Sequence, residues 1–330
     1  MQSTATKIGR RALVAACALA CLPLAHAQTA NYPTRTVRMI VGFPAGTGPD
    51  IVARLLAQKL TESWGNTAVV VDNKPGAGGL IAASEAARAA PDGYTIMLAE
   101  TGQLSIAPSS YNKLPYDPVK DFAPVSHVVS ADFALLVNPQ KVPAKTAKEF
   151  VAWSKQQKGL FMATFGAGTP GHFGAYMFGD AVGIKPEPVH YKSTGDALNG
   201  MFSGDVHAVF ASMGMAAPNV KAGKLHALGA TGPVRAASLP EVPTLKEQGF
   251  PTLEFSSWFG IVVPAKTPAD IVAKLSADVQ RATTSADGRQ KLEAAGFRVT
   301  GTSREEFAKI IAADTVTWGK AVASSGFKAD

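Results

Sequence analysis

Short extended apolar runs alternate with longer apolar stretches at helical spacing in the first half of the chain. Residues 36–60 read TVRMIVGFPAGTGPDIVARLLAQKL, and Val37, Met39 and Val41 alternate within an almost continuous apolar run. This pattern predicts a buried strand. Apolar residues recur at helical spacing after Pro49, and the first turn of a helix tolerates a proline. The segment therefore predicts a strand, a glycine-rich loop and a helix.

The same order of elements recurs further along the first half. A strand over residues 68–71 leads through a glycine loop to a helix over 80–90, and a third strand covers 94–99. Strand, helix and strand in this order imply parallel pairing and a doubly wound sheet. Ligands bind such sheets beyond the carboxyl ends of the strands. Three loops are expected at that edge: residues 43–48, 74–79 and 100–103.

A glycine loop between a strand and a helix favours an anion. The loop directs backbone N–H groups and the positive end of the helix dipole at one point. No lysine follows the first loop, so it is not a Walker A loop for phosphate. Asp50 lies in the first helical turn, and we expect its carboxylate to cap the loop amides. The alternative is a well-formed turn that holds no ligand.

The second half has its own units of strand, loop and helix. A strand over 160–165 precedes the loop 166–171 and a helix that begins at His172. We expect further strands over residues 189–191, 206–210 and 227–230. The apolar runs 133–137 and 257–263 predict two crossings between the halves. In the tail, Ser303 and Glu306 form the pattern of a capping box.

These elements predict an α/β protein with two doubly wound lobes joined by crossing strands. We expect a signal peptide over residues 1–27, a first lobe over 28–132 and 256–330, and a second lobe over 133–255. Two hinged lobes place a ligand site in the cleft between them.

The first residues have the pattern of a secretory signal peptide. Lys7, Arg10 and Arg11 precede an apolar run from 12 to 24, and Ala-His-Ala ends at Ala27. Cleavage near Ala27 would leave a periplasmic protein without cysteine, and the arginine pair leaves both Sec and twin-arginine export open. The formal net charge of +7 includes these three cations, and no basic run points to nucleic acid.

The motifs of enzymes are weak or missing. Residues 166–171 read GAGTPG and fit G-x-G-x-x-G, but Pro170 disturbs the turn, and exported proteins generally lack access to nicotinamide cofactors. The sequence has no G-x-S-x-G, no histidines at metal-ligand spacing and no evident acid–base pair. The sequence therefore predicts no cofactor, no metal and no catalysis. His172 is placed to cap the loop or to contact an anion.

Seven segments together resemble one family over essentially the whole mature chain. The chain is similar to the extracytoplasmic solute-binding receptors of tripartite tricarboxylate transporters, the Bug (Bordetella uptake gene) family. The segments that carry the resemblance, in order, are FPAGTGPDIVAR, DNKPGAGG, PDGYTIML, LPYDPVKDFAPV, GAGTPGH, AGKLHALGATG and LPEVPTLKEQGFP.

The resemblance implies a periplasmic receptor with a fold like that of type II periplasmic binding proteins. Such a receptor closes on an organic acid and delivers it to two membrane subunits. It also implies that main-chain amides and ordered waters hold a carboxylate at the loops matching 43–50, 75–79 and 166–172. Backbone donors bind a carboxylate without an arginine, which agrees with the argument from helix ends.

The candidate ligand-binding residues come from loops of both expected lobes. They are Phe43, Ala45, Thr47, Gly48, Asp50, Ala77, Gly78, Gly79 and Thr101 from the first lobe, and Gly168, Thr169, His172 and His207 from the second. Asp50 is expected to organise its loop rather than to contact the ligand.

Three positions depart from the family pattern. Thr47 replaces a glycine in the first loop, Ser193 replaces the glycine of Y-K-G, and His207 stands where an aspartate is frequent. An imidazole can donate to a carboxylate. His207 therefore predicts a second carboxylate on the ligand rather than an amine.

We expect a monomeric receptor for a small di- or tricarboxylate. A receptor for an aromatic carboxylate, nicotinate- or phthalate-like, is the alternative, with Phe43, Phe165 and Phe173 lining an apolar slot. An exported enzyme acting on organic acids is a further alternative. Membrane subunits of a tripartite tricarboxylate-type transporter are the expected partners, and a sensor protein remains open.

Overall fold

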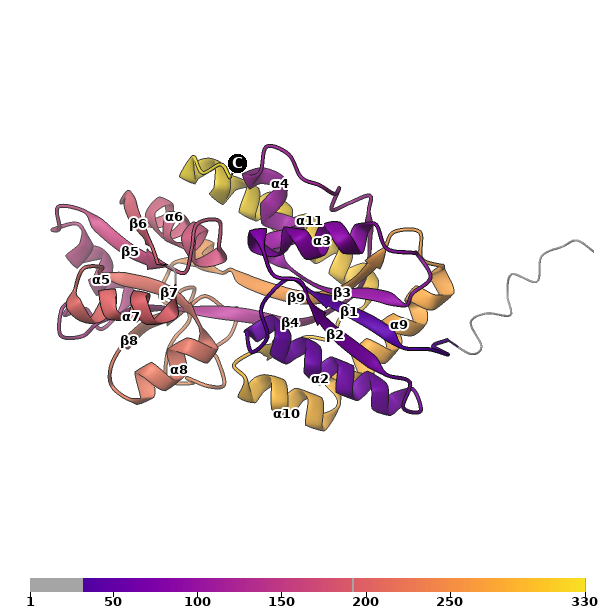
Figure 1. Cartoon of the computed structure of the whole chain (residues 1–330). Coiled ribbons are helices and arrows are strands. Elements are labelled where there is room, and N and C mark those ends of the chain that lie inside the picture. Colours follow the sequence, from indigo (N-terminus) through magenta and orange to yellow (C-terminus); the bar gives the residue numbers. More distant parts are fainter. Residues whose placement is uncertain (1–31, 192, 330) are drawn as a thin grey trace, which may run out of the picture. The chain divides into compact units, whose positions relative to one another are not determined.

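The computed structural model describes residues 32–191 and 193–329, so the expected signal peptide lies outside the described residues. Residues from Arg35 onward form one compact unit. Its strands and helices alternate along the chain, which confirms the α/β class (Figure 1). No helix in the described part of the chain is long and apolar enough to cross a membrane.

The bounds of the elements follow the expected order. The strands are β1 (Val37–Val41), β2 (Val69–Asn73), β3 (Thr95–Glu100), β4 (Phe122–Val137), β5 (Leu160–Thr164), β6 (Pro186–His190), β7 (Ala208–Ser212), β8 (His226–Ala230), β9 (Ser256–Pro264) and β10 (Arg298–Val299). The helices are α2 (Gly48–Ser63), η2 (Ala77–Gly79), α3 (Leu80–Ala87), η3 (Gly102–Ile106), α4 (Ala107–Ser110), α5 (Ala147–Ser154), α6 (Pro170–Val182), α7 (Thr194–Ser203), α8 (Met213–Lys221), η4 (Pro251–Leu253), α9 (Ala269–Thr284), α10 (Ala286–Ala294) and α11 (Arg304–Ser325).

In each half of the molecule, the strands that lead into the glycine loops are parallel to one another. β1 lies between β2 and β3, and Val41 pairs with Asn73 on one side and with Leu98 on the other. In the second half, β5 lies parallel to both β6 and β7. The loops after β1, β2 and β3 therefore leave the same edge of the sheet, as the sequence predicts.

Two long strands join the halves. β4 pairs with β9 through Asp132 and Ser256, and from Phe133 onward it pairs with β7 instead. One continuous path of hydrogen-bonded strands results, in the order β2-β1-β3-β9-β4-β7-β5-β6. The two expected crossings are therefore present, while the lobe boundaries at 132/133 and 255/256 stay a prediction.

Helices cover the faces of this sheet in both halves. In the first half, α2, α9 and α10 lie on one face, and α3, α4 and α11 lie on the other (Figure 1). The long α11 begins at the capping box of Ser303 and Glu306, which the sequence predicts correctly. Phe307 of this helix packs in the first half's core, whereas Trp318 packs with Phe255 in the core of the second half. The helix thus contributes to both cores, although the sequence assigns it to the first lobe alone.

The second-half strands are displaced by a few residues from their expected positions. β6 ends at His190 and β7 begins at Ala208, whereas we expect strands over 189–191 and 206–210. His207 therefore precedes its strand. The start of β7 lies at the amino edge of the parallel strands β5, β6 and β7, whereas the glycine loop leaves their carboxyl edge. His207 therefore lies away from that loop.

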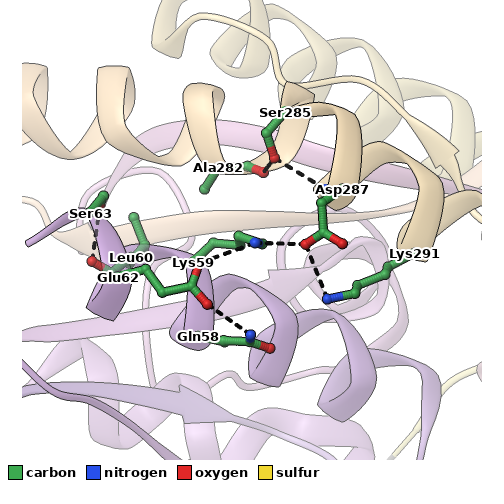
Figure 2. Close-up of polar contacts among 10 residues, drawn as sticks. Gln58, Lys59, Leu60, Glu62, Ser63, Ala282, Ser285, Asp287 and Lys291 are labelled. Atoms are coloured by element: carbon green, nitrogen blue, oxygen red, sulfur yellow. Dashed lines mark hydrogen bonds and ion pairs between the residues drawn. The ribbon is translucent and has the colours of Figure 1, made fainter. Parts of the chain in front are cut away.

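A cluster of charges fastens α2 to α10 (Figure 2). Lys59 of α2 pairs with Glu62 on its own helix at 3.1 Å and with Asp287 of α10 at 2.6 Å. Lys291 pairs with the same Asp287 carboxylate at 3.0 Å. Lys59 and Lys291 together hold the pKa of Asp287 below its usual value. The cluster therefore joins the carboxyl-terminal part of α2, the helix that follows the first glycine loop, to α10.

Replacing Lys59 with glutamine removes the cation shared by Glu62 and Asp287. We expect a small decrease in melting temperature, because exposed ion pairs contribute little to stability. The decrease should vanish in about 1 M sodium chloride, where such charges are screened. Scanning calorimetry measures both effects. Lys309→Gln is the matched control on α11, and a decrease at Lys59 that persists in salt would contradict the electrostatic explanation.

Candidate functional site

The loops that follow the parallel strands form the candidate site. In the first half they are the segments after β1, β2 and β3, and in the second half they are the segments after β5 and β6 (Figure 1). The carboxyl ends of parallel strands are the usual position for ligands in α/β sheets.

Asp50 organises the first loop through a set of hydrogen bonds. Its carboxylate is 2% exposed and accepts from Gly46 N–H at 2.8 Å, from Arg54 Nε at 2.9 Å and from Asn73 Nδ2 at 3.0 Å. Asn73 Nδ2 also donates to Phe43 O at 2.9 Å. Burial raises the pKa of Asp50, but these hydrogen bonds outweigh burial and hold the pKa below its usual value. Asp50 is thus occupied within the protein, in the organising position that the sequence suggests.

The remaining residues of this loop face outward. Ala45 is exposed, while Phe43, Thr47 and Gly48 are partly exposed. The Thr47 hydroxyl donates to Pro44 O at 2.7 Å and makes no capping bond to α2. The start of α2 therefore presents backbone rather than a side-chain cap.

The second loop is a run of left-handed residues. Gly76, Ala77, Gly78 and Gly79 have φ values of 132°, 47°, 62° and 89°. Ala77 is uncommon among non-glycine residues in adopting such a value. The Gly79 N–H donates to Gly76 O at 2.9 Å and so closes the turn. The loop is therefore a tight glycine turn at the carboxyl end of β2, at the same sheet edge as the first loop.

Gln103 ties the second loop to the third. Its Nε2 donates to Gly79 O at 3.1 Å, and its Oε1 accepts from Glu100 N–H at 2.9 Å. Gly42 lies against both, because a Cβ at Gly42 would come within 2.5 Å of Gln103 Nε2 and 2.8 Å of Gly79 Cα. Thr101 is fully buried, and its hydroxyl accepts from Trp258 N–H at 2.7 Å. Thr101 thus fastens β9 and leaves its side chain no opening to a ligand.

The loop after β5 is held by Thr169 and His172. Thr169 caps α6, since its hydroxyl oxygen accepts from His172 N–H, and it donates to Gly166 O at 2.8 Å. Gly168 N–H donates to His172 Nδ1 at 3.1 Å. His172 is 2% exposed, and burial together with the nearby His190 lowers its pKa to about 4. His172 is therefore a neutral imidazole that holds its loop.

The structure does not bring His207 to these loops. Its ring lies between Trp153 and Phe161, with centroid distances of 5.1 Å and 5.6 Å. Its Nδ1 accepts from Phe161 N–H at 3.2 Å. His207 precedes β7, and Phe161 lies near the start of β5, so both belong to the amino edge of parallel strands. The predicted contact of His207 with a second carboxylate therefore has no geometric support.

Two residues at the loops are absent from the predicted set. His190 ends β6, and its ring centroid lies 4.7 Å from that of His172. Glu100 ends β3, and burial raises the pKa of its carboxyl to about 8. The sequence signal for both is their place at a strand end, but strand ends are the least certain part of a sequence interpretation.

No group of three or more histidine, cysteine or acidic side chains within residues 32–191 and 193–329 is arranged to hold a metal ion. The site instead offers glycine-loop backbone, short hydroxyls and neutral imidazoles. Such an arrangement can bind a small anion, because N–H and O–H donors supply hydrogen bonds without a competing side-chain charge.

Solved structures define the class of protein to which this fold and site belong. The structure of an R. palustris protein with adipate is 30% identical with a TM-score of 0.79, and it covers 90% of this chain and 99% of that one. MatC from Rhodopseudomonas palustris, with bound malate, is 31% identical with a TM-score of 0.75, and the match covers 88% of this chain and 100% of that one. The fold is that of the periplasmic binding proteins.

Sequence comparison gives the family. The model of the tripartite tricarboxylate transporter family receptor matches residues 52–327. Protein BugT of Bordetella pertussis is 30% identical over 90% of this chain and 91% of its own length. A UPF0065 protein of Cupriavidus necator is 33% identical over 96% of this chain and 94% of its own length. The chain belongs to this receptor family, as its seven segments suggest, and the family and fold are those of solute-binding receptors rather than enzymes.

Replacing Asp50 with alanine leaves the Gly46 N–H and the Asn73 amide without their shared acceptor. We expect a loss of about 1.5–3 kcal/mol in unfolding free energy, because hydrogen bonds to a charged group are lost. Because the native pKa is lowered, the Asp50 contribution is complete above the unfolded pKa and disappears as pH falls through the native value. Urea unfolding measures both, with exposed Glu241→Ala as control. Equal stabilities of the two variants would contradict the role of Asp50.

Glu100 gives stability the opposite dependence on pH. Its native pKa of about 8 exceeds the usual value of 4.5, so the native state retains a proton that the unfolded state has lost. Stability should therefore fall as pH rises between these values, and Glu100→Gln should remove the fall. Between about pH 6 and pH 8 we expect the variant to gain about 2 kcal/mol over the wild type. Urea unfolding at several pH values measures this difference. If the unfolding free energies of the two proteins changed equally with pH, Glu100 would be ionised in the native state and the prediction would be wrong.

Proposed function

We propose that the protein is a periplasmic receptor that captures a small organic di- or tricarboxylate and delivers it to the membrane subunits of a tripartite tricarboxylate-type transporter. One observation carries the proposal. Glycine loops lead into α2 and α6 in the two halves of the molecule, and each lies at the carboxyl ends of parallel strands. A ligand with two anionic ends matches two such loops.

The electrostatics of the loops support an anion. The start of a helix carries a partial positive charge, and free N–H groups at that point bind carboxylates well. The Asp50 carboxylate is already paired with Arg54, so its negative charge is compensated within the protein. His172 is neutral, with a lowered pKa, and does not supply a permanent cation. The proposed recognition is thus by hydrogen-bond donors.

The proposed contacts are narrower than the predicted set. Asp50 and Thr101 organise the site from within, because their oxygens already accept internal hydrogen bonds. His207 is left out for the geometric reason given above. His172 is likewise buried and holds its own loop. The proposed ligand-contacting residues are Phe43, Ala45, Thr47, Gly48, Ala77, Gly78 and Gly79 from the first half, and Gly168 and Thr169 from the second.

Relatives provide independent support for the ligand class. The two similar R. palustris proteins were solved with adipate and malate, and both compounds are dicarboxylates. Transport requires no catalysis, because closure needs only a ligand that interacts better with the closed state. Periplasmic location and cleavage near Ala27 belong to the same proposal, as does a monomeric state.

The alternative of a receptor for an aromatic carboxylate has less structural support. Phe173 is fully buried and packs against Phe327, with a centroid distance of 5.9 Å, so it cannot line an open slot. Phe43 and Phe165 remain partly exposed at the loops. Aromatic carboxylates therefore belong in the same ligand screen.

A thermal-shift screen of the chain from residue 28 onward tests the proposal. The compounds are mono-, di-, tri- and aromatic carboxylates, with acidic amino acids, sugars and nucleotides for comparison. A ligand at about 100 times its dissociation constant adds about 2.7 kcal/mol, which raises the melting temperature by several degrees. We expect the shift for a few related di- or tricarboxylates. Responses only to sugars or nucleotides would overturn the proposal.

A further inference from the structure

Two histidine rings meet at the loop edge of the second half. His190 is the last residue of β6, and in the parallel register it pairs with Thr164, the last residue of β5. His172 lies in the first turn of α6, directly after the loop that leaves β5. The ring centroids of His172 and His190 are 4.7 Å apart, and the ring planes are nearly perpendicular at 83°. Local sequence patterns do not indicate this pair, because its members lie 18 positions apart and most of α6 runs between them.

Hydrogen bonds fix the tautomer of His172, and at His190 the tautomer depends on where the Thr164 hydroxyl proton lies. Gly168 N–H donates to His172 Nδ1, so this nitrogen is an acceptor and the proton of the neutral ring is on Nε2. The Thr164 hydroxyl lies 2.7 Å from His190 Nδ1 and 3.3 Å from Gly166 O. We assign its proton to the shorter contact, which makes His190 Nδ1 an acceptor as well. In this arrangement both rings carry N–H at Nε2.

The packing gives the two rings different parts. His172 is 2% exposed, and the rings of Phe173, Tyr176 and Phe327 surround it at centroid distances of 4.8–5.4 Å. His190 is exposed, and its ring contacts the cluster at His172. His172 is therefore a fixed support, and His190 has a ring edge available to a ligand. Among residues 32–191 and 193–329, no hydrogen bond involves Nε2 of either ring.

The charge state of the pair matches an anion. Burial lowers the pKa of both rings, and for His172 the neighbouring His190 adds to the effect. Both imidazoles are thus neutral near pH 7. With Nδ1 already occupied, a neutral ring of this tautomer offers the ligand only a donor, and a donor suits a carboxylate oxygen rather than a cation.

We propose that His190 donates its Nε2–H to a second carboxylate of the ligand, and that Thr164 and His172 position the ring for this contact. The contact makes the receptor prefer a dicarboxylate to the monocarboxylate of the same chain length. This inference rests on the proposed function and adds to it the side chain that selects the ligand class. His190, rather than His207, is then the imidazole that donates to the second carboxylate.

Calorimetric titration at one pH near 7, with a dicarboxylate and the monocarboxylate of the same chain length, tests the inference. The pair is adipate and hexanoate if adipate binds. If it does not, the dicarboxylate that binds is compared with its own monocarboxylate. His190→Phe keeps a flat ring and removes the donor. A hydrogen bond to a charged group corresponds to an affinity change of about 10- to 100-fold. We expect this loss for the dicarboxylate and no loss for the monocarboxylate. His207→Phe, at the other edge of the strands, is the matched control and should change neither affinity.

Thr164 tests the positioning part. Thr164→Val removes the hydroxyl at nearly constant volume, so His190 is no longer held in one tautomer. We expect a smaller decrease in the ratio of dicarboxylate to monocarboxylate affinity, and Thr164→Ser should restore the ratio because it restores the hydroxyl. A purely structural role for Thr164 would lower both affinities together and leave the ratio unchanged, which would overturn its assignment.

The outcomes separate this inference from the proposed function. If the wild type binds no carboxylate, the proposed function fails. If the wild type binds the dicarboxylate but His190→Phe retains full affinity, or loses affinity equally for both ligands, His190 does not read the second carboxylate, and the receptor assignment still stands. If His207→Phe alone lowers dicarboxylate affinity, the sequence hypothesis is right and this inference is wrong.

Discussion

The buried Asp50 carboxylate is the interaction on which the candidate site depends. A loop of proline, alanine and glycine has no side chains with which to hold its own shape, so its form must be set from beneath. Asp50 does this by accepting from Gly46 N–H, and Asn73 extends the same network to Phe43 O. The bond from Gly46 fixes the exposed turn, and the bond from Asn73 links that turn to the end of β2.

The organisation of the second half follows the same physical rule by other means. There Thr169 and His172 supply the acceptors that Asp50 supplies in the first half. In both places a buried polar group satisfies some loop amides and so fixes the direction of the rest. The continuous strands β4 and β9 connect the two halves, and their pairing ends at Asp132 and Ser256, where β4 passes to β7. Asp132 is also held there by Arg298 at 2.9 Å.

Features of the fold that depend on residues close together in the chain are predicted well from the sequence. The glycine loops, the order of strands and helices and the capping box of Ser303 and Glu306 all depend on residues close together in the chain. The two crossings are also predictable, since each is a long apolar run. The family assignment follows from seven segments in order, and both the structural and the sequence comparisons bear it out.

The remaining features depend on contacts between distant residues. His207 lies just before β7, at the amino edge of the parallel strands, and its Nδ1 accepts from Phe161 N–H of the neighbouring strand. The raised pKa of Glu100 comes from burial by the surrounding fold, which no local pattern reports. Trp318 packs in the second core because α11 is long enough to reach it, and helical periodicity does not say which sheet a helix face covers.

The central claim is that backbone amides of the glycine loops receive the ligand's carboxylates. Amide NMR spectra of the isotopically labelled mature protein, recorded with and without a dicarboxylate that raises its melting temperature, test this claim most directly. We expect the largest shifts on loop amides, among them those of Gly48 and Gly78. Unchanged loop amides, with the shifts concentrated on another surface of the molecule, would contradict it.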